Sequence, residues 1–160
     1  MTWLRTPPRI KVLEALSAIA DGRIELVSED KKFARVRSSL GDRVYIVYVD
    51  PVKGEAYSDD NGTRYRGYVG YPIISLLMIQ GVLPFDKRIA DALKGIPWRE
   101  LNEKYKRYDV VEKIVLSEAE KHGVTSSEIR EFIDKVYREL KKLKLRKLEK
   151  PPLPKLNVFF

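Results

Sequence analysis

The 160-residue chain contains no cysteine. Disulfide bridges, thiolate zinc sites and a cysteine nucleophile are therefore excluded. Histidine is almost absent too, because His122 is the only one, and a lone imidazole cannot build a histidine metal site. It precedes Gly123 at an expected helix end, where a cation would interact favourably with the helix dipole. The sequence predicts no metal and no other cofactor.

Motifs of catalysis are missing as well. Neither GxxxxGK[ST] nor GxGxxG occurs, so no phosphate-binding loop is indicated. The acidic run at residues 58–62 fails as a calcium loop, because its twelfth position, counted from Asp59, is Gly70 rather than glutamate. A metal-dependent nuclease could draw on Asp50, Glu55, Asp59 or Asp60, but the acid-x-lysine pattern is lacking. We therefore expect a non-enzymatic protein, with an enzyme using these acids as the alternative.

Amide side chains are scarce, and long apolar runs are missing. The only amides are Asn61, Asn102, Asn157 and Gln80, while 34% of residues are charged, a composition typical of proteins from hot environments. No apolar run approaches the roughly 18 residues that span a membrane, and the first residues lack the apolar region of a signal peptide. These features predict a soluble cytoplasmic protein with no membrane contact.

The first part of the chain is predicted to form a helix followed by strands. Apolar residues recur at helical spacing over residues 10–20. Short stretches separated by turn residues then predict strands, and residues 59–62 carry a strong hairpin signal. The expected strands of an antiparallel meander are residues 23–27, 33–38, 43–50, 55–58 and 63–69.

The second part reads as helices. Proline, glycine and capping-box signals place their starts and ends, with Asp109–Glu112 and Thr125–Glu128 as the two boxes. The expected helices cover residues 71–81, 85–93, 97–105, 109–121 and 125–148. We therefore predict an α+β fold, an N-terminal helix and small antiparallel β meander followed by a helical bundle with a long C-terminal helix. The expected parts are residues 1–69, 70–150 and a proline-rich apolar tail, 151–160.

The last expected helix carries an apolar seam. Its residues follow one another at spacings of four and three, as in the a/d pattern of packed helices. The seam either packs on helix 109–121 within one bundle or binds another subunit. For the second interpretation the candidate interface is Ile129, Phe132, Ile133, Val136, Tyr137 and Leu140.

The positive charge is concentrated at the same end. Residues 135–160 hold nine Lys/Arg and two acids, a net charge of +7 out of the total of +8. Such a local field favours a polyanion or an acidic protein surface. The alternative is a solvated helix face that keeps the protein soluble. The candidate contact residues are Lys141, Lys142, Lys144, Arg146 and Lys147.

Tyrosines crowd the expected sheet, with Arg64 and Arg66 between them. Aromatic rings and arginines on a sheet can stack single-stranded nucleic acid. Aromatic residues also favour strands and fill small cores, which is the alternative. The tyrosines concerned are Tyr45, Tyr48, Tyr57, Tyr65, Tyr68 and Tyr71.

The order of parts resembles one family. A strand leads into Gly70-Tyr-Pro-Ile-Ile-Ser-Leu-Leu-Met, and a late helical pair ends with Ser127-Glu-Ile-Arg-Glu-Phe-Ile. Over about residues 55–148 this is similar to the archaeal-type GINS replication-complex subunit whose β domain precedes its helical domain. The resemblance implies a non-catalytic scaffold in a heterotetramer with a sister subunit. It also implies contacts with the replicative helicase, a RecJ-family protein, primase and possibly DNA.

The tail carries a second, weaker resemblance. Leu156, Phe159 and Phe160 match the hydrophobic end of a sliding-clamp-binding peptide, although Leu153 replaces the usual leading glutamine. Sliding-clamp binding is one interpretation of these residues. The other is a hydrophobic tail that folds back on the body of the protein.

Overall fold

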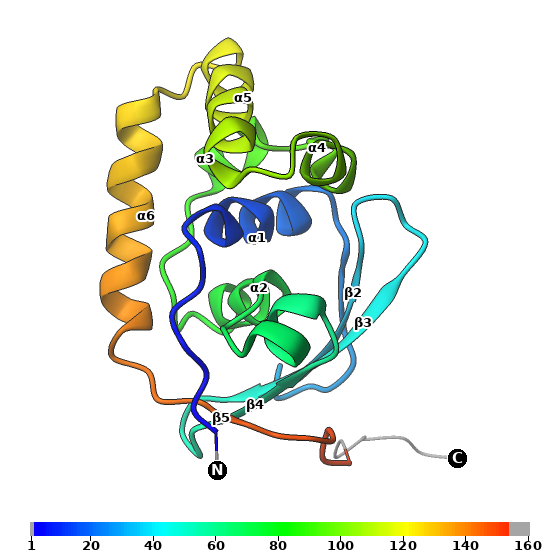
Figure 1. Cartoon of the computed structure of the whole chain (residues 1–160). Helices are drawn as coiled ribbons and strands as arrows, with labels where there is room; N and C mark the ends of the chain where they lie inside the picture. Colours follow the sequence, from blue (N-terminus) through cyan, green and yellow to red (C-terminus); the bar gives the residue numbers. More distant parts are fainter. Residues whose placement is uncertain (1, 154–160) are drawn as a thin grey trace.

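The structure, a computed structural model, describes residues 2–153 and has the α+β fold that the sequence predicts (Figure 1). Five short strands and six α-helices make up the described part, together with one π-helical turn, η1. In chain order they are α1 (Ile10–Ala20), β1 (Ile24–Leu26), β2 (Phe33–Arg37), β3 (Val44–Asp50), β4 (Glu55–Ser58), η1 (Gly62–Arg66), α2 (Tyr71–Ile79), α3 (Lys87–Ala92), α4 (Trp98–Tyr105), α5 (Tyr108–Lys121), α6 (Ser126–Leu140) and β5 (Arg146–Lys147).

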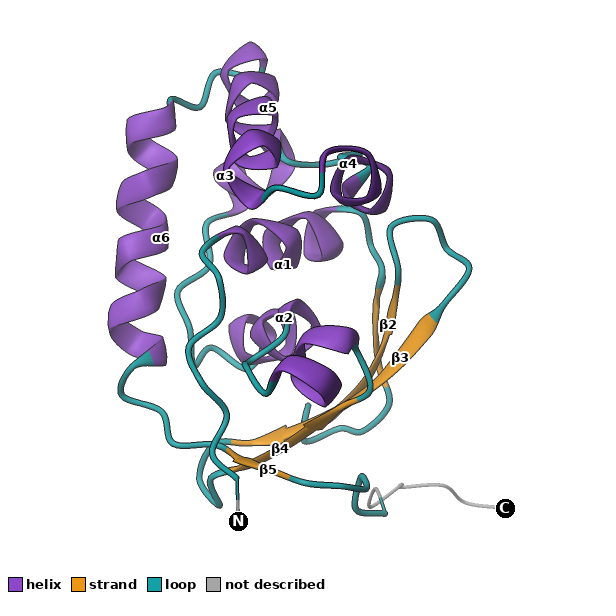
Figure 2. Ribbon diagram, viewed as in Figure 1, coloured by secondary structure: helices purple, strands orange, loops and turns teal. Residues whose placement is uncertain are grey.

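The elements are stacked in layers around one core (Figure 2). The apolar helix α2 packs on β3 and β4, α1 lies over α2, and α3 packs on the far side of α1. The buried side chains form one continuous cluster, which runs from Val47 of the sheet through Leu13 and Ile74 to Ile133 of α6. The two predicted parts therefore share a single core over residues 2–150. Within residues 2–153, no helix combines the length and apolar character needed to cross a membrane.

The sheet order is β1-β2-β3-β4-β5, with antiparallel pairs except for the parallel pair β4–β5. The predicted meander is correct for its first four strands and wrong for residues 63–69, which form η1 and a loop. The Asp60 carboxylate accepts hydrogen bonds from the backbone N–H (3.1 Å) and the hydroxyl (2.8 Å) of Thr63. These local bonds favour a helical turn over a strand.

The predicted last helix ends too late. Helix α6 stops at Leu140 rather than near residue 148, because Leu145 enters the core and the backbone around it joins the sheet edge. The N–H of Arg146 donates to the Gly54 carbonyl and that of Leu148 to the Ala56 carbonyl, both at 2.8 Å. Burial and sheet pairing therefore override the helical propensity of this segment.

The two predicted capping boxes have opposite outcomes. The box that starts α6 is confirmed, because the Thr125 hydroxyl accepts from the Glu128 N–H while the Glu128 carboxylate accepts from the Thr125 N–H. The box predicted at Asp109 is wrong, since α5 begins one residue earlier, after Arg107, and has no side-chain cap. Its first turn still carries Asp109, which suits the helix dipole.

The turn between β3 and β4 depends on Asp50. This carboxylate is buried (2% exposed), accepts the N–H groups of Val52 and Lys53 at 3.0 Å, and forms an ion pair with Lys32 at 3.1 Å. Burial opposes its charge, but the Lys53 N–H and the Lys32 ammonium outweigh that effect, so the pKa of Asp50 lies below its usual value. The same turn presents the Gly54 carbonyl that anchors β5.

Replacing this carboxylate tests its role in the turn. We expect Asp50→Asn to lower the free energy of unfolding by about 1–2 kcal/mol near neutral pH, because charge-assisted hydrogen bonds are lost. A depressed pKa in the folded state gives stability that is present above the unfolded pKa of about 3.9 and is lost as the pH falls through the folded pKa. Urea unfolding at neutral and at acidic pH should therefore show the gap to the unsubstituted protein closing in acid.

A control for this experiment is the exposed pair Lys87–Asp91, at 2.7 Å. Asp91→Asn should cost less than about 0.5 kcal/mol at either pH, because exposed i,i+4 pairs contribute little. A gap for Asp50→Asn that is equal at both pH values would contradict the assigned role of the charge.

Candidate functional site

An extended segment, residues 2–5, lies between two parts of the chain that are distant in sequence. On one side the Leu4 N–H donates to the Leu145 carbonyl and the Lys147 N–H to the Thr2 carbonyl, both at 2.8 Å. On the other side the Arg5 N–H donates to the Gly67 carbonyl and the Val69 N–H to the Arg5 carbonyl. This pairing brings residues 2–5 side by side with residues 67–69 on one side and 145–147 on the other. The N-terminal segment and β5 lie at the lower edge in Figure 1.

Residues 2–5, 64–68 and 141–147 form a surface that we call the basic face. They contain eight lysine and arginine residues and no aspartate or glutamate. The side chains that alternate with them point inward, since Leu145 is only 2% exposed and Leu4 packs against the core. The cations of the basic face are Arg5, Arg64, Arg66, Lys141, Lys142, Lys144, Arg146 and Lys147.

Few of these cations are neutralised by acids. Lys142 forms an ion pair with Glu139 at 3.0 Å, and Arg146 forms one with Glu55 at 2.9 Å. The other six have no ion-pair partner within residues 2–153. The positive field of the basic face is therefore largely uncompensated, as a polyanion-binding surface requires.

Local contacts hold the cations near one another. The Lys147 ammonium donates to the Arg64 carbonyl at 2.8 Å, and the Arg5 guanidinium donates to the Arg66 carbonyl. Arg5 and Lys141 also line one small cavity of about 120 Å³ beside the end of α6. Successive positive groups thus follow one another from the end of α6 to η1.

Two aromatic rings are exposed among these cations. Tyr65 is 73% exposed and Trp3 is 50% exposed, although burial of rings this large is strongly favourable. The Arg64 guanidinium carbon lies 5.9 Å from the centre of the Tyr65 ring, a cation–π contact. Exposed rings beside unneutralised cations provide both elements that single-stranded nucleic acid needs, stacking surfaces and phosphate contacts.

The structure brings together all five predicted polyanion contacts, Lys141, Lys142, Lys144, Arg146 and Lys147. They lie on the turn after α6 and on β5 instead of on a helix. The sequence missed their neighbours Trp3 and Arg5, which lie about 140 residues away along the chain. Arg64, Arg66 and Tyr65 were noted in the sequence, but nothing there links them to residues 141–147.

The apolar seam of α6 faces the chain's own core. The predicted interface residues Ile129, Phe132, Ile133, Val136 and Leu140 are all buried there, and α6 packs on α1 and α5. Tyr137 is half-buried, and its hydroxyl donates to the Pro7 carbonyl. Of the predicted interface, only Tyr137 therefore retains a partly accessible side chain in the single chain.

Three other tyrosines of the predicted stacking set, Tyr45, Tyr48 and Tyr71, have structural contacts. The Tyr48 hydroxyl donates to Glu55 at 2.8 Å, and burial raises the pKa of this tyrosine. The rings of Tyr45 and Tyr71 meet edge to face at 6.3 Å. Only Tyr65 of this set is highly exposed.

The acids considered for catalysis are engaged in holding turns and strands. The Asp50 carboxylate accepts the Val52 N–H in its turn, and Glu55 pairs with Arg146. The Asp59 carboxylate accepts the Ile46 N–H, and the Asp60 carboxylate accepts the Thr63 N–H. In the described part of the chain, no three His, Asp or Glu side chains cluster as a metal site would need. His122 caps the C-terminus of α5, as its position in the sequence predicts.

The predicted tail contacts Leu156, Phe159 and Phe160 lie outside the described residues. The two interpretations of these residues, sliding-clamp binding and folding back on the body, stay predictions.

A family model described as "Uncharacterised conserved protein UCP014422" matches residues 4–146, which include most of the basic face. Neither a curated protein nor a solved structure matches the chain.

The position of the basic face depends on the burial of Leu145. We expect Leu145→Ala to lower the free energy of unfolding by about 2–4 kcal/mol, because it leaves a cavity under β5. Chemical unfolding would measure the loss. Leu153→Ala is the matched control and should leave stability unchanged, since Leu153 is 93% exposed. Equal stability of the two variants would show that β5 is not anchored through this side chain.

Proposed function

We propose that this chain, which belongs to the family described as Uncharacterised conserved protein UCP014422, binds single-stranded nucleic acid through the basic face. One observation carries this proposal. The exposed rings of Tyr65 and Trp3 lie among six cations that have no ion-pair partner in residues 2–153.

The cations account for affinity without sequence preference. Each lysine or arginine that contacts a phosphate releases a counterion, so binding weakens linearly with the logarithm of the salt concentration. For a single strand the slope is roughly −0.7 for each neutralised phosphate, so six contacts would give a slope of about −4. Apart from Arg5, Arg64 and Arg66, residues 1–134 carry about as many acids as bases, so the strand is attracted mainly to the basic face.

The exposed rings favour a single strand over an acidic protein or a duplex. Unpaired bases offer a π-face to Tyr65 and Trp3, and each such stack contributes about 1–3 kcal/mol. In a duplex the bases are already stacked, and an acidic protein surface gains from the cations alone. A strand of a few nucleotides would contact both phosphate-binding cations and rings.

The GINS-type scaffold role stays a prediction of the resemblance. It needs an apolar surface for a sister subunit, whereas the α6 seam is buried within this chain. Co-expression with a candidate sister subunit, followed by size-exclusion chromatography with light scattering, would test it. We assign no reaction to the basic face, and the absence of enzymatic activity likewise stays a prediction.

Neutralising four cations tests the electrostatic part of the proposal. We choose Arg64, Arg66, Lys141 and Lys144, which form no ion pair within the described part of the chain. Their replacement by glutamine should weaken binding of a labelled oligothymidine at least about a hundredfold and reduce the salt slope from about −4 to about −1.5. Fluorescence anisotropy at several salt concentrations measures both quantities.

The matched control removes four exposed cations elsewhere, Lys94, Lys113, Arg130 and Lys135. The net charge falls by the same amount in both variants. If the two variants bind equally, the whole-molecule charge and not the basic face is responsible, and the proposal fails.

Removing a ring tests the stacking part. Tyr65→Ala should weaken binding of the oligonucleotide about five- to 150-fold, whereas Tyr65→Phe should bind like the unsubstituted protein because it retains the π-face. Phe85→Ala is the control, because it removes another exposed ring (42% exposed) that lies outside the basic face, and it should have no effect.

Polyglutamate as a competitor separates nucleic acid from an acidic protein partner. An acidic-protein site would be blocked by polyglutamate at concentrations comparable to those of the oligonucleotide, and Tyr65→Ala would not change its affinity. That combination of results would show that the basic face binds an acidic protein and not nucleic acid.

A further inference from the structure

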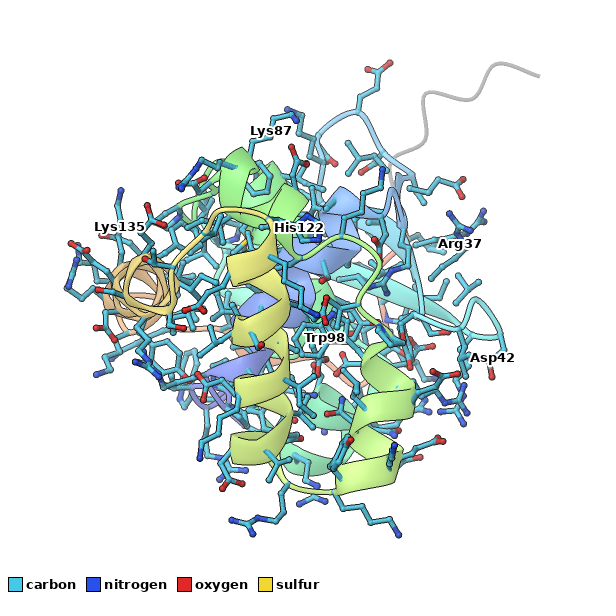
Figure 3. All side chains as sticks on the ribbon, turned by 90° about the horizontal axis from the view of Figure 1, so that it is seen from above. Arg37, Asp42, Lys87, Trp98, His122 and Lys135 are labelled. Atoms are coloured by element: carbon cyan, nitrogen blue, oxygen red, sulfur yellow. The ribbon has the colours of Figure 1, made fainter. Side chains whose placement is uncertain are left out.

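A second hollow lies away from the basic face, between α1, α4 and the β2–β3 hairpin. This cleft has a volume of about 460 Å³, within the range of about 300–1,000 Å³ that is typical of small-molecule sites. Its walls also include the residues just before η1 and the first residue of α2, Tyr71. Figure 3 shows Trp98 toward the centre of the molecule, whereas Asp42 on the β2–β3 hairpin lies at the edge of the molecule.

The floor of the cleft carries a buried ion pair. The Lys11 ammonium lies 3.1 Å from the Glu14 carboxylate, which is only 4% exposed, and the Asn102 amide N–H also donates to that carboxylate at 3.1 Å. Burial opposes the charge of Lys11, but Glu14 outweighs it, so the pKa of Lys11 lies above its usual value. Lys11 thus stays charged at neutral pH, and its ion pair with Glu14 makes the floor a polar surface.

Two buried polar atoms in the wall lack partners. The indole N–H of Trp98 and the Oδ1 of Asn102 have no hydrogen-bond partner within residues 2–153, and Trp98 is only 3% exposed. Such a buried unsatisfied group costs about 1–3 kcal/mol, which makes it rare unless a ligand satisfies it. The two residues are four apart on α4, so they lie on one face of the helix. Together they offer one donor and one acceptor to the same ligand.

Cations line the mouth of the cleft. Its lining includes five lysine or arginine residues and three acids, of which Glu14 is paired with Lys11 and Glu103 with Arg99. Arg43 and Lys106 have no ion-pair partner in the part of the chain that the structure describes. The uncompensated charge favours an anionic group on the ligand, such as a phosphate.

Aromatic rings complete the lining. Tyr45 and Tyr71 meet edge to face at 6.3 Å, and the Arg23 guanidinium lies 5.9 Å from the Tyr71 ring centre. Rings of this kind pack against a flat, heterocyclic part of a ligand.

From these observations we infer that the cleft binds a nucleoside monophosphate. The base edge would pair with the Trp98 indole N–H and the Asn102 Oδ1, and the phosphate would lie at Arg43 and Lys106. A heterocycle with adjacent acceptor and donor atoms satisfies both unpartnered groups at once, which neither a simple anion nor an apolar ligand can do. The inference is independent of the proposed nucleic-acid binding, because it rests on other residues.

Trp98 itself can report binding. The chain has only two tryptophans, so a Trp3→Phe protein has fluorescence from Trp98 alone. Titration with AMP, GMP, CMP and UMP should change this fluorescence, with at least one dissociation constant below about 1 mM. The matching nucleoside and inorganic phosphate should each bind at least about tenfold more weakly. If all four monophosphates fail to bind by fluorescence and by calorimetry, the inference is wrong.

Trp98→Phe separates ligand recognition from folding. It keeps an aromatic ring but removes the indole N–H, so nucleotide affinity measured by calorimetry should fall roughly tenfold. Because Trp98 is only 3% exposed, the smaller ring leaves a cavity and lowers the unfolding midpoint somewhat. The affinity is therefore measured well below that midpoint, on protein whose circular dichroism matches that of the unsubstituted protein. Unchanged affinity in this variant would overturn the assignment of the base edge to Trp98.

Two variants test where the phosphate of the nucleotide binds: Lys106→Gln in the cleft, and the fourfold glutamine variant of the basic face. Lys106→Gln should weaken the nucleotide but not the nucleoside. The protein with Arg64, Arg66, Lys141 and Lys144 replaced by glutamine should bind the nucleotide normally. Loss of nucleotide binding in the basic-face variant, with retention in Lys106→Gln, would place the nucleotide on the basic face and overturn the inference.

Discussion

The pairing of residues 2–5 with residues 145–147 and 67–69 is the constraint on which the rest of this structure depends. A two-residue strand such as β5 has too few hydrogen bonds to hold its place alone. Here it is fixed from both sides, by Gly54 and Ala56 of the sheet and by Thr2 and Leu4 of the extended segment. The side chain of Leu145, which is buried under this edge of the sheet, adds apolar contacts that stabilise β5. One set of backbone bonds thus fixes the edge of the sheet, the end of α6 and the position of η1.

Local patterns predict the elements that rely on local interactions. The helix at residues 10–20 matches α1, and the Thr125–Glu128 box starts α6, because periodicity and capping involve neighbouring residues. Elements formed by distant partners escape prediction. Residues 146–147 become a strand only through Gly54 and Thr2. Residues 63–69 are a different case, because the local hydrogen bonds from Thr63 to the Asp60 carboxylate favour a helical turn that the strand pattern did not indicate. Charge composition indicated half of the basic face, but Trp3 and Arg5 join it only through the fold, and no sequence signal marked the cleft.

The turn η1 links the basic face to the cleft. Asp60 and Gly62 line the cleft, while Arg64 and Arg66 belong to the basic face. The turn is closely packed and leaves no room for a side chain at Gly62 or at the nearby Gly70. A Cβ atom on Gly62 would lie 2.4 Å from the Tyr68 ring, and one on Gly70 would lie 2.2 Å from the Asp60 carboxylate. The two surfaces therefore share one closely packed element.

The division of the basic face between distant parts of the chain has a consequence for synthesis on the ribosome. Trp3 meets Arg146 only after about 140 further residues have been added, and closing so long a loop is slow. Until then Arg5, Arg64 and Arg66 belong to a chain that is close to neutral, because most of the excess charge lies beyond residue 134. A nascent chain of this protein therefore lacks the assembled basic face until residues 141–147 have left the ribosome.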